Sequence, residues 1–294
     1  MPHDADRSRA FLLVWVAYLA AIVAALLVGI GLAGRHPIEL VLAADLAATF
    51  VVFGFSMAFD NSSFYDPYWS VAPPLIGLAF VCSAEAGAAV PARQALVLGL
   101  VALWALRLTW NWARGWSGLR HEDWRYVDMR ESSGGRYWLV SLLAIHLFPT
   151  GVVLLGCLPL WLALAEGGRP LGGLDALGAA LVLGGTALEY FADNQLRRFR
   201  LAGPPPGSTL ESGLWAWSRH PNYLGEILFW LGLATFGLAA AGFRWWAWLG
   251  ALAMLAMFRF ASLPMIEKRM LARRPGYAER QRRVSLLIPW PPKA

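Results

Sequence analysis

The chain is poor in charged residues and in cysteine. Only 15% of its 294 residues are charged, and 58% are hydrophobic, whereas a typical soluble domain is about a quarter charged. The shortage of charge therefore excludes an ordinary soluble domain if the apolar residues cluster. The two cysteines, Cys82 and Cys157, lie in apolar runs, and their number and spacing indicate neither a disulfide framework nor a zinc site. The five histidines show no i, i+4 pairing, so no metal site is predicted.

The apolar residues do cluster, in runs close to the ~20 residues that span a bilayer. These runs cover about residues 11–32, 39–59, 69–86, 94–113, 137–163, 174–192, 223–241 and 245–263. We therefore expect an all-α, polytopic transmembrane bundle of about seven to eight spans, forming a single integral membrane domain over residues 1–294. The weakest run is 69–86, which is short and contains Pro73, Pro74 and Glu85. The first run is too long for the apolar part of a signal peptide.

Positive charge is concentrated on one side of the predicted bundle. Of the 25 Lys and Arg residues, 19 lie in the N-terminal segment, in the two long loops 114–136 and 193–222, and in the tail 264–294. With eight spans these segments share a face, and an excess of Lys and Arg marks the cytoplasmic face. We expect both termini in the cytoplasm, most simply of a bacterium with the bundle in its inner membrane. The net charge of +6 is explained by this asymmetry, so neither nucleic-acid binding nor an obligate protein partner is predicted.

One predicted span carries a polar stripe. In 104-WALRLTWNWARGW-116, the residues Trp104, Arg107, Asn111 and Arg114 are spaced by three, four and three, which places them on one helical face. An arginine near the end of a span can extend its head group to the interface. Arg107 lies about two turns inside, however, so an anionic ligand or an acidic partner is the better explanation for it.

A second stripe lies in 189-EYFADNQLRRFR-200. Glu189, Asp193 and Arg197 repeat every four residues, and Arg200 follows one turn later. Ion pairs on a helix surface are one explanation of this spacing. Glu189 is deeper in the span, and an ionisable residue there is a functional hypothesis by default.

An acidic residue also precedes the third run, in 60-DNSSFYDPYWSVAPP-74. Asp66 followed by Pro67 is the pattern of a helix N-cap before a proline at the first helical position. The alternative is a functional acid, because Tyr65, Tyr68 and Trp69 surround it in sequence. A carboxyl group among aromatic side chains can have a raised pKa and act as a proton donor.

A third feature is 218-SRHPNYLGEILFWLGLA-234, in which cations stand directly before an apolar helix. Pro221 suits the first turn of that helix, and a helix N-terminus binds anions through its free N–H groups and dipole. We expect Arg219 and His220 to meet an anion from the cytoplasm, while Asn222 and Glu226, one turn deeper, reach a polar part of the same ligand. The alternative is a basic anchor at the membrane surface, with Glu226 paired to an arginine of another span.

The chain resembles a known group of membrane proteins. The stretch 218-SRHPNYLGE-226 and the tail 267-EKRMLARRPGYAERQRRVSLLIP-289 resemble the C-terminal half of the steroid 5α-reductase-like proteins, whose superfamily includes isoprenylcysteine carboxyl methyltransferases. Three further stretches, 64-FYDPYWS-70, 107-RLTWNWARGWSGLRHEDWRY-126 and 193-DNQLRRFR-200, are similar to the reductase branch and in particular to its bacterial DUF1295 members. The resemblance covers about residues 50–290.

That resemblance implies an NADPH-dependent reductase that saturates a C=C bond conjugated to a carbonyl in an apolar, steroid- or lipid-like substrate arriving from the bilayer. Asp66 matches the catalytic acid, with Tyr65 or Tyr68 as candidate proton sources. Trp69 and Trp104 are predicted to contact substrate, although Trp104 stands where the steroid enzymes have a tyrosine. The predicted residues for the cofactor, in a pocket open to the cytoplasm, are Arg107, Asn111, Arg114, Asp193, Asn194, Arg197, Arg200, Arg219, His220, Asn222, Tyr223 and Glu226.

Two other functions fit parts of the sequence. A SAM-dependent methyltransferase acting on a lipid or isoprenoid accounts for Arg219, His220 and the tail, but not for Asp66 or the Arg107 stripe. A non-catalytic lipid carrier accounts for polar residues within spans, but not for an acid, arginines and a helix N-terminus on one face. The mixed-charge loop 121–130 is either solvated or, as we favour, folded over the adenosine end of the cofactor.

Overall fold

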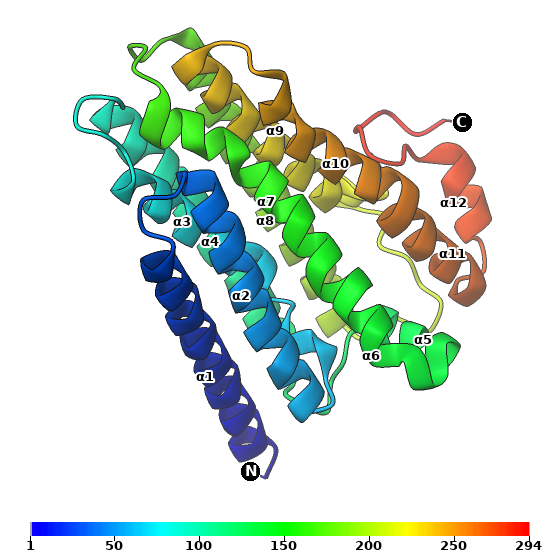
Figure 1. Ribbon diagram of the computed structural model, residues 1–294. Helices are drawn as coiled ribbons and strands as arrows, with labels where there is room; N and C mark the ends of the chain where they lie inside the picture. The colour runs from blue at the N-terminus through cyan, green and yellow to red at the C-terminus, as the bar shows by residue number, and fades with distance from the viewer. Residues whose placement is uncertain (1, 294) are drawn as a thin grey trace.

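The structure, a computed structural model, describes residues 2–293, and that range contains helices and loops but no sheet. The α-helices are α1 (Pro2–Gly31), α2 (Pro37–Ala58), α3 (Tyr68–Cys82), α4 (Pro91–Gly115), α5 (Trp124–Ser133), α6 (Tyr137–Val140), α7 (Phe148–Trp161), α8 (Gly173–Leu201), α9 (Pro221–Ala241), α10 (Leu249–Met257), α11 (Leu263–Arg273) and α12 (Tyr277–Arg283). They form one elongated bundle, with α12 at its side (Figure 1).

Seven helical segments of the described chain are long and apolar enough to cross a membrane. They cover residues 6–31, 37–58, 91–115, 124–166, 173–201, 221–241 and 245–273. The remaining expected run, 69–86, forms α3, which has 15 residues and contains Pro73 and Pro74. Fifteen helical residues extend only about 22 Å, less than the ~30 Å hydrocarbon core. The protein is therefore a polytopic helical membrane protein, as predicted.

Two of the long segments contain π-helical turns. Ser141–Leu147 joins α6 to α7, and Phe258–Ser262 joins α10 to α11. A third π-helical turn, Leu162–Glu166, ends the first of these segments. A π-helical turn inside a longer helix is rare and is often found at a functional site. The expected span 137–163 is thus the inner part of a longer helical unit, 124–166.

Prolines and glycines set the helix boundaries. Pro37, Pro91 and Pro221 open α2, α4 and α9, where the missing N–H costs nothing because the first turn has no acceptor for it. Gly242 follows the end of α9 with φ of 81°, a left-handed conformation that glycine adopts without strain. These signals explain why α2, α4 and α9 begin within three residues of the predicted spans. The segments 124–166, 173–201 and 245–273 extend about ten residues beyond the predicted runs at one end.

Glycines also let the helices approach closely. A Cβ atom on Gly185 of α8 would lie 2.4 Å from the carbonyl oxygen of Gly225 in α9. Similarly, a Cβ on Gly250 would lie 2.2 Å from the backbone nitrogen of Gly156 in α7. Small residues at helix contacts are typical of membrane proteins, where close backbone packing replaces the hydrophobic driving force.

The basic segments lie at one end of the bundle. The Arg7 side chain donates to the carbonyl oxygen of Ala113 at the end of α4, at 3.0 Å, and the backbone N–H of Arg219 donates to the Ser285 carbonyl oxygen at 2.9 Å. In Figure 1 the N-terminus lies at the bottom, and α5 and α11 lie at the right. Arg269 of the tail also donates to Asp128 of α5 at 3.2 Å, so the long basic segments gather at one end of the bundle.

Candidate functional site

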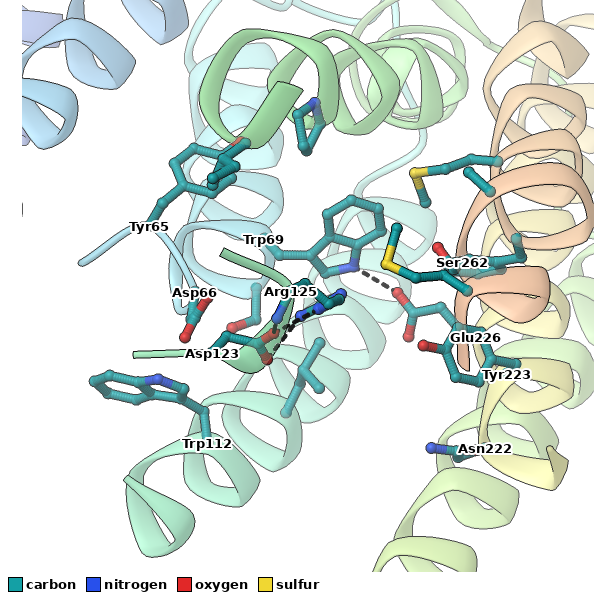
Figure 2. Close-up of a pocket in the computed structure, with 18 of the residues that line it drawn as sticks. Tyr65, Asp66, Trp69, Trp112, Asp123, Arg125, Asn222, Tyr223, Glu226 and Ser262 are labelled. Carbon is teal, nitrogen blue, oxygen red and sulfur yellow. Dashed lines mark hydrogen bonds and ion pairs between the residues drawn. The ribbon is translucent and has the colours of Figure 1, made fainter. Parts of the chain in front are cut away.

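A cavity of about 630 Å³ lies within this basic end of the bundle. Its walls come from the turn before α3 and from α4, α5, α7, α8, α9 and the α10–α11 unit. Figure 2 shows Asp66 on one side and Asn222, Tyr223 and Glu226 on the other. The predicted site residues on its walls are Tyr65, Asp66, Trp69, Asn111, Asp193, Arg200, Asn222, Tyr223 and Glu226. Polar groups that are far apart in sequence thus converge on one cavity.

Asp66 is held by a phenol group from another part of the chain. The Tyr126 hydroxyl donates a hydrogen bond to Oδ1 of Asp66 at 2.8 Å. Burial is the main cause that raises the pKa of Asp66 to about 7, and the nearby Asp123 carboxylate adds to the rise. The charge of Arg125 and the Tyr126 hydrogen bond oppose it. A carboxyl group with this pKa is available both as an acid and as a base near neutral pH.

Asp66 does not cap α3, although the Asp-Pro pattern allowed that interpretation. The N-cap residue is Pro67, and no side chain accepts a hydrogen bond from the first turn. The helix begins one residue later than the pattern suggests, after a short 3₁₀ turn at residues 62–64, and Asp66 lines the cavity. Its carboxylate is therefore free for the Tyr126 contact.

The loop 121–130, whose role the sequence left open, forms part of the cavity wall. Asp123, Arg125 and Tyr126 line the cavity. Asp123 caps α5 and accepts a hydrogen bond from Nε of Arg125 at 2.8 Å. Although burial acts in the opposite direction, the hydrogen bonds and charge of Arg125 hold the pKa of Asp123 below its ordinary value. Asn61 fixes the loop by donating to the carbonyl oxygens of Leu119 and His121, at 2.7 and 3.1 Å.

The two candidate tyrosines lie in different surroundings. Tyr65 lines the cavity, and its hydroxyl is 2.7 Å from Oγ1 of Thr150 in α7. The Tyr68 hydroxyl instead donates to Oδ1 of Asp45 in α2 at 2.5 Å, and Tyr68 is absent from the cavity wall. Tyr68 begins α3, and its hydroxyl contacts α2. It therefore has no direct access to a ligand in the cavity.

Asp193 is the centre of a polar cluster between α4, α8 and α9. It accepts hydrogen bonds from Arg107 at 2.9 Å, from Asn111 at 3.0 Å and from Asn222 at 3.3 Å. Arg107 also forms a salt bridge with Glu189. Arg107 is thus neutralised by two carboxylates and is not on the cavity wall, whereas Asn111, Asp193 and Asn222 are.

The remaining predicted residues of these helices fasten α4 to α8. Arg114 donates to Oδ1 of Asn111 at 2.7 Å and to Oδ1 of Asn194 at 2.5 Å. Arg197 donates to the Arg114 carbonyl oxygen at 3.4 Å. Arg114, Asn194 and Arg197 therefore lie outside the lining of the cavity. They hold α4 against α8 beside the cluster around Asp193.

Three indole groups hold the carboxylate of Glu226. Trp69 and Trp230 donate to Oε1 at 2.7 and 3.1 Å, and Trp104 donates to Oε2 at 3.1 Å. Trp104 is fully buried and stacks on Phe229, with ring centroids 3.9 Å apart. Trp104 does not line the cavity, so it holds Glu226 in position and does not contact a ligand in the cavity. Trp69 does line the cavity.

A second cavity, of about 480 Å³, adjoins the first and shares Leu196, Arg200, Asn222 and Tyr223 with it. Its lining is strongly basic, and the cationic or ionisable members are Arg200, Arg219, His220, Arg269, Arg273, Arg274 and Arg280. Glu267, Asp128 and Glu211 pair with four of these groups. Arg200, Arg273 and Arg274 form no salt bridge within residues 2–293, so these three offer a favourable potential for an anion.

Arg219 and His220 line this cavity, but both are already engaged by the tail. Glu267 accepts from NH2 of Arg219 at 3.0 Å and lies 2.7 Å from Nε2 of His220. The same carboxylate accepts from Tyr277 and Gln281, both at 2.6 Å. NH1 of Arg219 donates to two backbone carbonyls of the tail. In this arrangement Arg219 and His220 hold the tail against the start of α9. A phosphate in the second cavity could therefore contact only the arginines that are not paired with a carboxylate.

Sequence reasoning assigned no role to four residues of interest. Asp45 is a buried acid within a predicted span, and its presence there was a signal by itself. Arg93 and Asp175 form a fully buried salt bridge of 2.7 Å at the opposite end of the bundle. No local sequence pattern identifies Tyr126, because Tyr126 and Asp66 are 60 positions apart in the chain.

The fold and the cavities define a class of protein, a polytopic helical membrane protein with an internal polar site at one membrane face. A sequence profile described as a protein of unknown function (DUF1295) matches residues 52–284. The chain therefore belongs to the DUF1295 family. It is also similar to an uncharacterized protein of Schizosaccharomyces pombe, with 29% identity over 265 residues that cover 81% of this chain and 76% of that protein. No solved structure matches the chain.

Proposed function

We propose that the protein is an NADPH-dependent membrane reductase that saturates a C=C bond conjugated to a carbonyl group in an apolar substrate. The observation that carries this proposal is the Asp66–Tyr126 pair, an acid with a pKa near neutrality on the wall of a cavity that also has apolar lining and adjoins a second, basic cavity. The resemblance to steroid 5α-reductase-like proteins points to the same chemistry.

The donors of the two cavities suit a dinucleotide. Two adjoining cavities of about 630 and 480 Å³ are within the size range of small-molecule sites. The basic cavity would hold phosphates through Arg200, Arg273 and Arg274. In the shared wall, Oδ1 of Asn222 is buried without a hydrogen-bond partner among the described residues. An acceptor left unpaired in this way suits an N–H donor such as a carboxamide. When bound, NADPH supplies the hydride.

The acid then polarises the substrate. Protonated Asp66 donates a hydrogen bond to the substrate carbonyl, which draws electron density from the β-carbon and stabilises the enolate that forms. Tyr126 keeps the Asp66 carboxyl group oriented. The Tyr65 hydroxyl, on the same cavity wall, is the candidate donor of the proton that the α-carbon takes up.

An apolar substrate would enter from the bilayer. Ala144, Phe148 and Ala261 line the cavity and are also exposed on the outer surface of the bundle. They belong to the two segments that contain the π-helical turns before α7 and before α11. An apolar wall that passes from the cavity to the lipid-facing surface gives such a substrate a route that avoids water.

The orientation follows from charge. The N-terminus and the long basic segments share one end of the bundle, and positive residues favour the cytoplasmic face. We therefore propose that both termini and the basic cavity face the cytoplasm, which supplies NADPH. In a bacterium the membrane would be the inner membrane.

Nucleotide binding provides the first test. NADPH and SAM are titrated separately against the purified protein, and thermal unfolding is followed. A ligand at a hundred times its dissociation constant stabilises the native state by about 2.7 kcal/mol. We expect NADPH to stabilise and SAM not to. Stabilisation by SAM alone would support a methyltransferase, and stabilisation by apolar ligands alone would support a lipid carrier.

Turnover provides the second test. Asp66→Asn preserves shape but cannot donate the same proton, so it should abolish enone-dependent oxidation of NADPH while the binding of NADPH is retained. The matched control is Asp60→Asn, since the side chain of Asp60 is 77% exposed and lies outside the cavity lining. Unchanged turnover in Asp66→Asn would remove Asp66 from the chemistry.

A further inference from the structure

The end of the chain forms an exposed apolar patch beside the start of α9. The side chains of Trp217, Ile288 and Trp290 are 47%, 68% and 66% exposed. The backbone N–H of Trp290 donates to the Trp217 carbonyl oxygen at 3.1 Å, which brings the end of the chain next to the residues that precede α9. We call these three residues the tail patch. Large apolar side chains that are exposed together mark a surface that contacts something nonpolar.

The position of the tail patch along the chain places it at the membrane surface. α9 begins at Pro221 and is one of the segments that can span a bilayer, so Trp217 stands four positions before a span. The N–H of Arg219 donates to the Ser285 carbonyl oxygen at 2.9 Å, which holds the segment after α12 at the same level. In Figure 1 the chain turns back after α12, so its last residues lie beside the bundle. Tryptophan is enriched at this depth, where its ring lies among the headgroups.

The other side of this segment is fastened to the bundle. Leu287 packs against the hydrophobic core. NH1 of Arg219 donates to the carbonyl oxygens of Gln281 and Val284, both at 2.8 Å. Because the backbone is held at these points, the fold itself directs the side chains of the tail patch outward.

Two cations lie close to the tail patch. The N–H of Lys293 donates to the Arg283 carbonyl oxygen at 3.0 Å, and Nε of Arg283 donates to the Lys293 carbonyl oxygen at 3.2 Å. Both residues are exposed, and neither forms a salt bridge within residues 2–293. The neighbouring Arg282, in contrast, pairs with Glu279. Unpaired cations beside exposed indole rings match a bilayer surface that carries anionic lipids, because such a surface attracts Lys and Arg.

We propose that the tail patch, together with Arg283 and Lys293, binds the anionic phospholipid surface of the membrane at the basic end of the bundle. The three apolar side chains lie between the headgroups and the upper acyl chains, and the two cations contact lipid phosphate groups. This lipid surrounds every copy of the protein, so the patch is covered without a second copy or another protein. The proposal does not depend on the reductase function.

The depth of the tail patch can be measured with a fluorescent label. Cys82→Ser removes the exposed thiol and leaves Cys157, which is buried. In this background Ile288→Cys is labelled with bimane, and single copies are placed in phosphatidylcholine nanodiscs. Acyl chains brominated near the headgroup quench a label that touches them, so fluorescence should fall relative to unbrominated lipid. Equal fluorescence in the two lipids would overturn the proposal, because position 288 would then face water.

A second labelled position controls for the label itself. Glu131 is exposed at the basic end of the bundle, near the end of α5 and before the apolar run that begins at residue 137. Bimane at Glu131→Cys should be equally bright in both lipids. Quenching there as strong as at position 288 would show that the label enters the bilayer wherever it is attached, and the depth argument would fail.

Lipid charge is tested with matched pairs of substitutions. Replacing part of the phosphatidylcholine by phosphatidylglycerol should increase quenching at position 288. Arg283→Gln with Lys293→Gln should remove this increase, whereas Lys268→Gln with Arg282→Gln removes the same charge from the tail and should retain it. An equal loss in both pairs would show that net charge alone attracts the lipid, and the assigned phosphate contacts would be wrong.

The aromatic contribution is tested in the same nanodiscs. Trp217→Gln with Trp290→Gln should abolish most of the quenching at position 288 in neutral lipid. Trp245→Gln is the matched control, because Trp245 is 67% exposed at the opposite end of the bundle, and it should have no effect. If position 288 is shielded only in nanodiscs that hold two copies, the tail patch is an interface between copies and the lipid proposal is wrong. Neither NADPH nor turnover enters these measurements, so their outcome is separate from that of the proposed function.

Discussion

The ionisation of Asp66 leads to a prediction that requires no knowledge of the substrate. The Asp66 carboxyl group has a pKa of about 7 in the cavity, compared with 3.8 ordinarily. At 1.36 kcal/mol per pKa unit this difference corresponds to at most about 4 kcal/mol, reduced by the partial exposure of the side chain. Because the pKa is raised in the native state, the native protein binds this proton more tightly than the unfolded chain does.

The sign follows from proton linkage. The stabilising contribution of neutral Asp66 is complete below pH ~4, is lost progressively as the pH rises toward ~7, and is absent above that pH. Asp66→Asn has no such titration. Between pH 5 and pH 8 the wild type should therefore lose at most about 2.5 kcal/mol relative to Asp66→Asn. For a protein of this length that is a relative decrease in Tm of at most about 5 °C.

The assay compares thermal unfolding of wild type, Asp66→Asn and Asp60→Asn in the same detergent at pH 5 and pH 8. Taking the difference between wild type and variant removes the titration of every group that the two proteins share. Asp60→Asn should track the wild type, since the Asp60 side chain is 77% exposed. A difference between wild type and Asp66→Asn that is the same at both pH values, or that changes in the opposite direction, would refute the buried-acid reasoning.

Three further substitutions test the packing and the polar clusters. Gly185→Ala should destabilise by about 1–3 kcal/mol, because its Cβ would lie 2.4 Å from backbone oxygen, whereas Gly184→Ala, with no atom within 4 Å of the added Cβ, should be neutral in the same unfolding assay. Glu267→Ala should cost about 3–5 kcal/mol and should make the tail sensitive to limited proteolysis, while an intact tail would show that the other contacts suffice. Arg107→Met leaves Asp193 without its cation, so we expect a similar loss of stability and weaker NADPH binding, both measured by thermal shift. Unchanged NADPH binding would show that the cluster around Asp193 is not part of the cofactor site.

The sequence alone determined the membrane class, the starts of several helices and the gathering of the basic segments at one end of the bundle. Runs of apolar residues, prolines and glycines act locally, so they can be read without the fold. The i, i+4 spacing likewise placed Arg107 with Asn111, and Glu189 with Asp193, on common faces. These helix faces do meet, because buried charged residues on two spans are stable only when they find one another.

Tertiary structure alone decided which of these residues reach the cavity. Local spacing gives the face of a helix but not the residue opposite it, so the contact of Tyr126 with Asp66 could not be predicted. For the same reason the spacing could not predict that Trp104 donates a hydrogen bond to Glu226 or that Arg219 is bound by the tail. The partners of a buried polar group come from distant segments, because each donor must be satisfied by whichever acceptor the packing brings within reach.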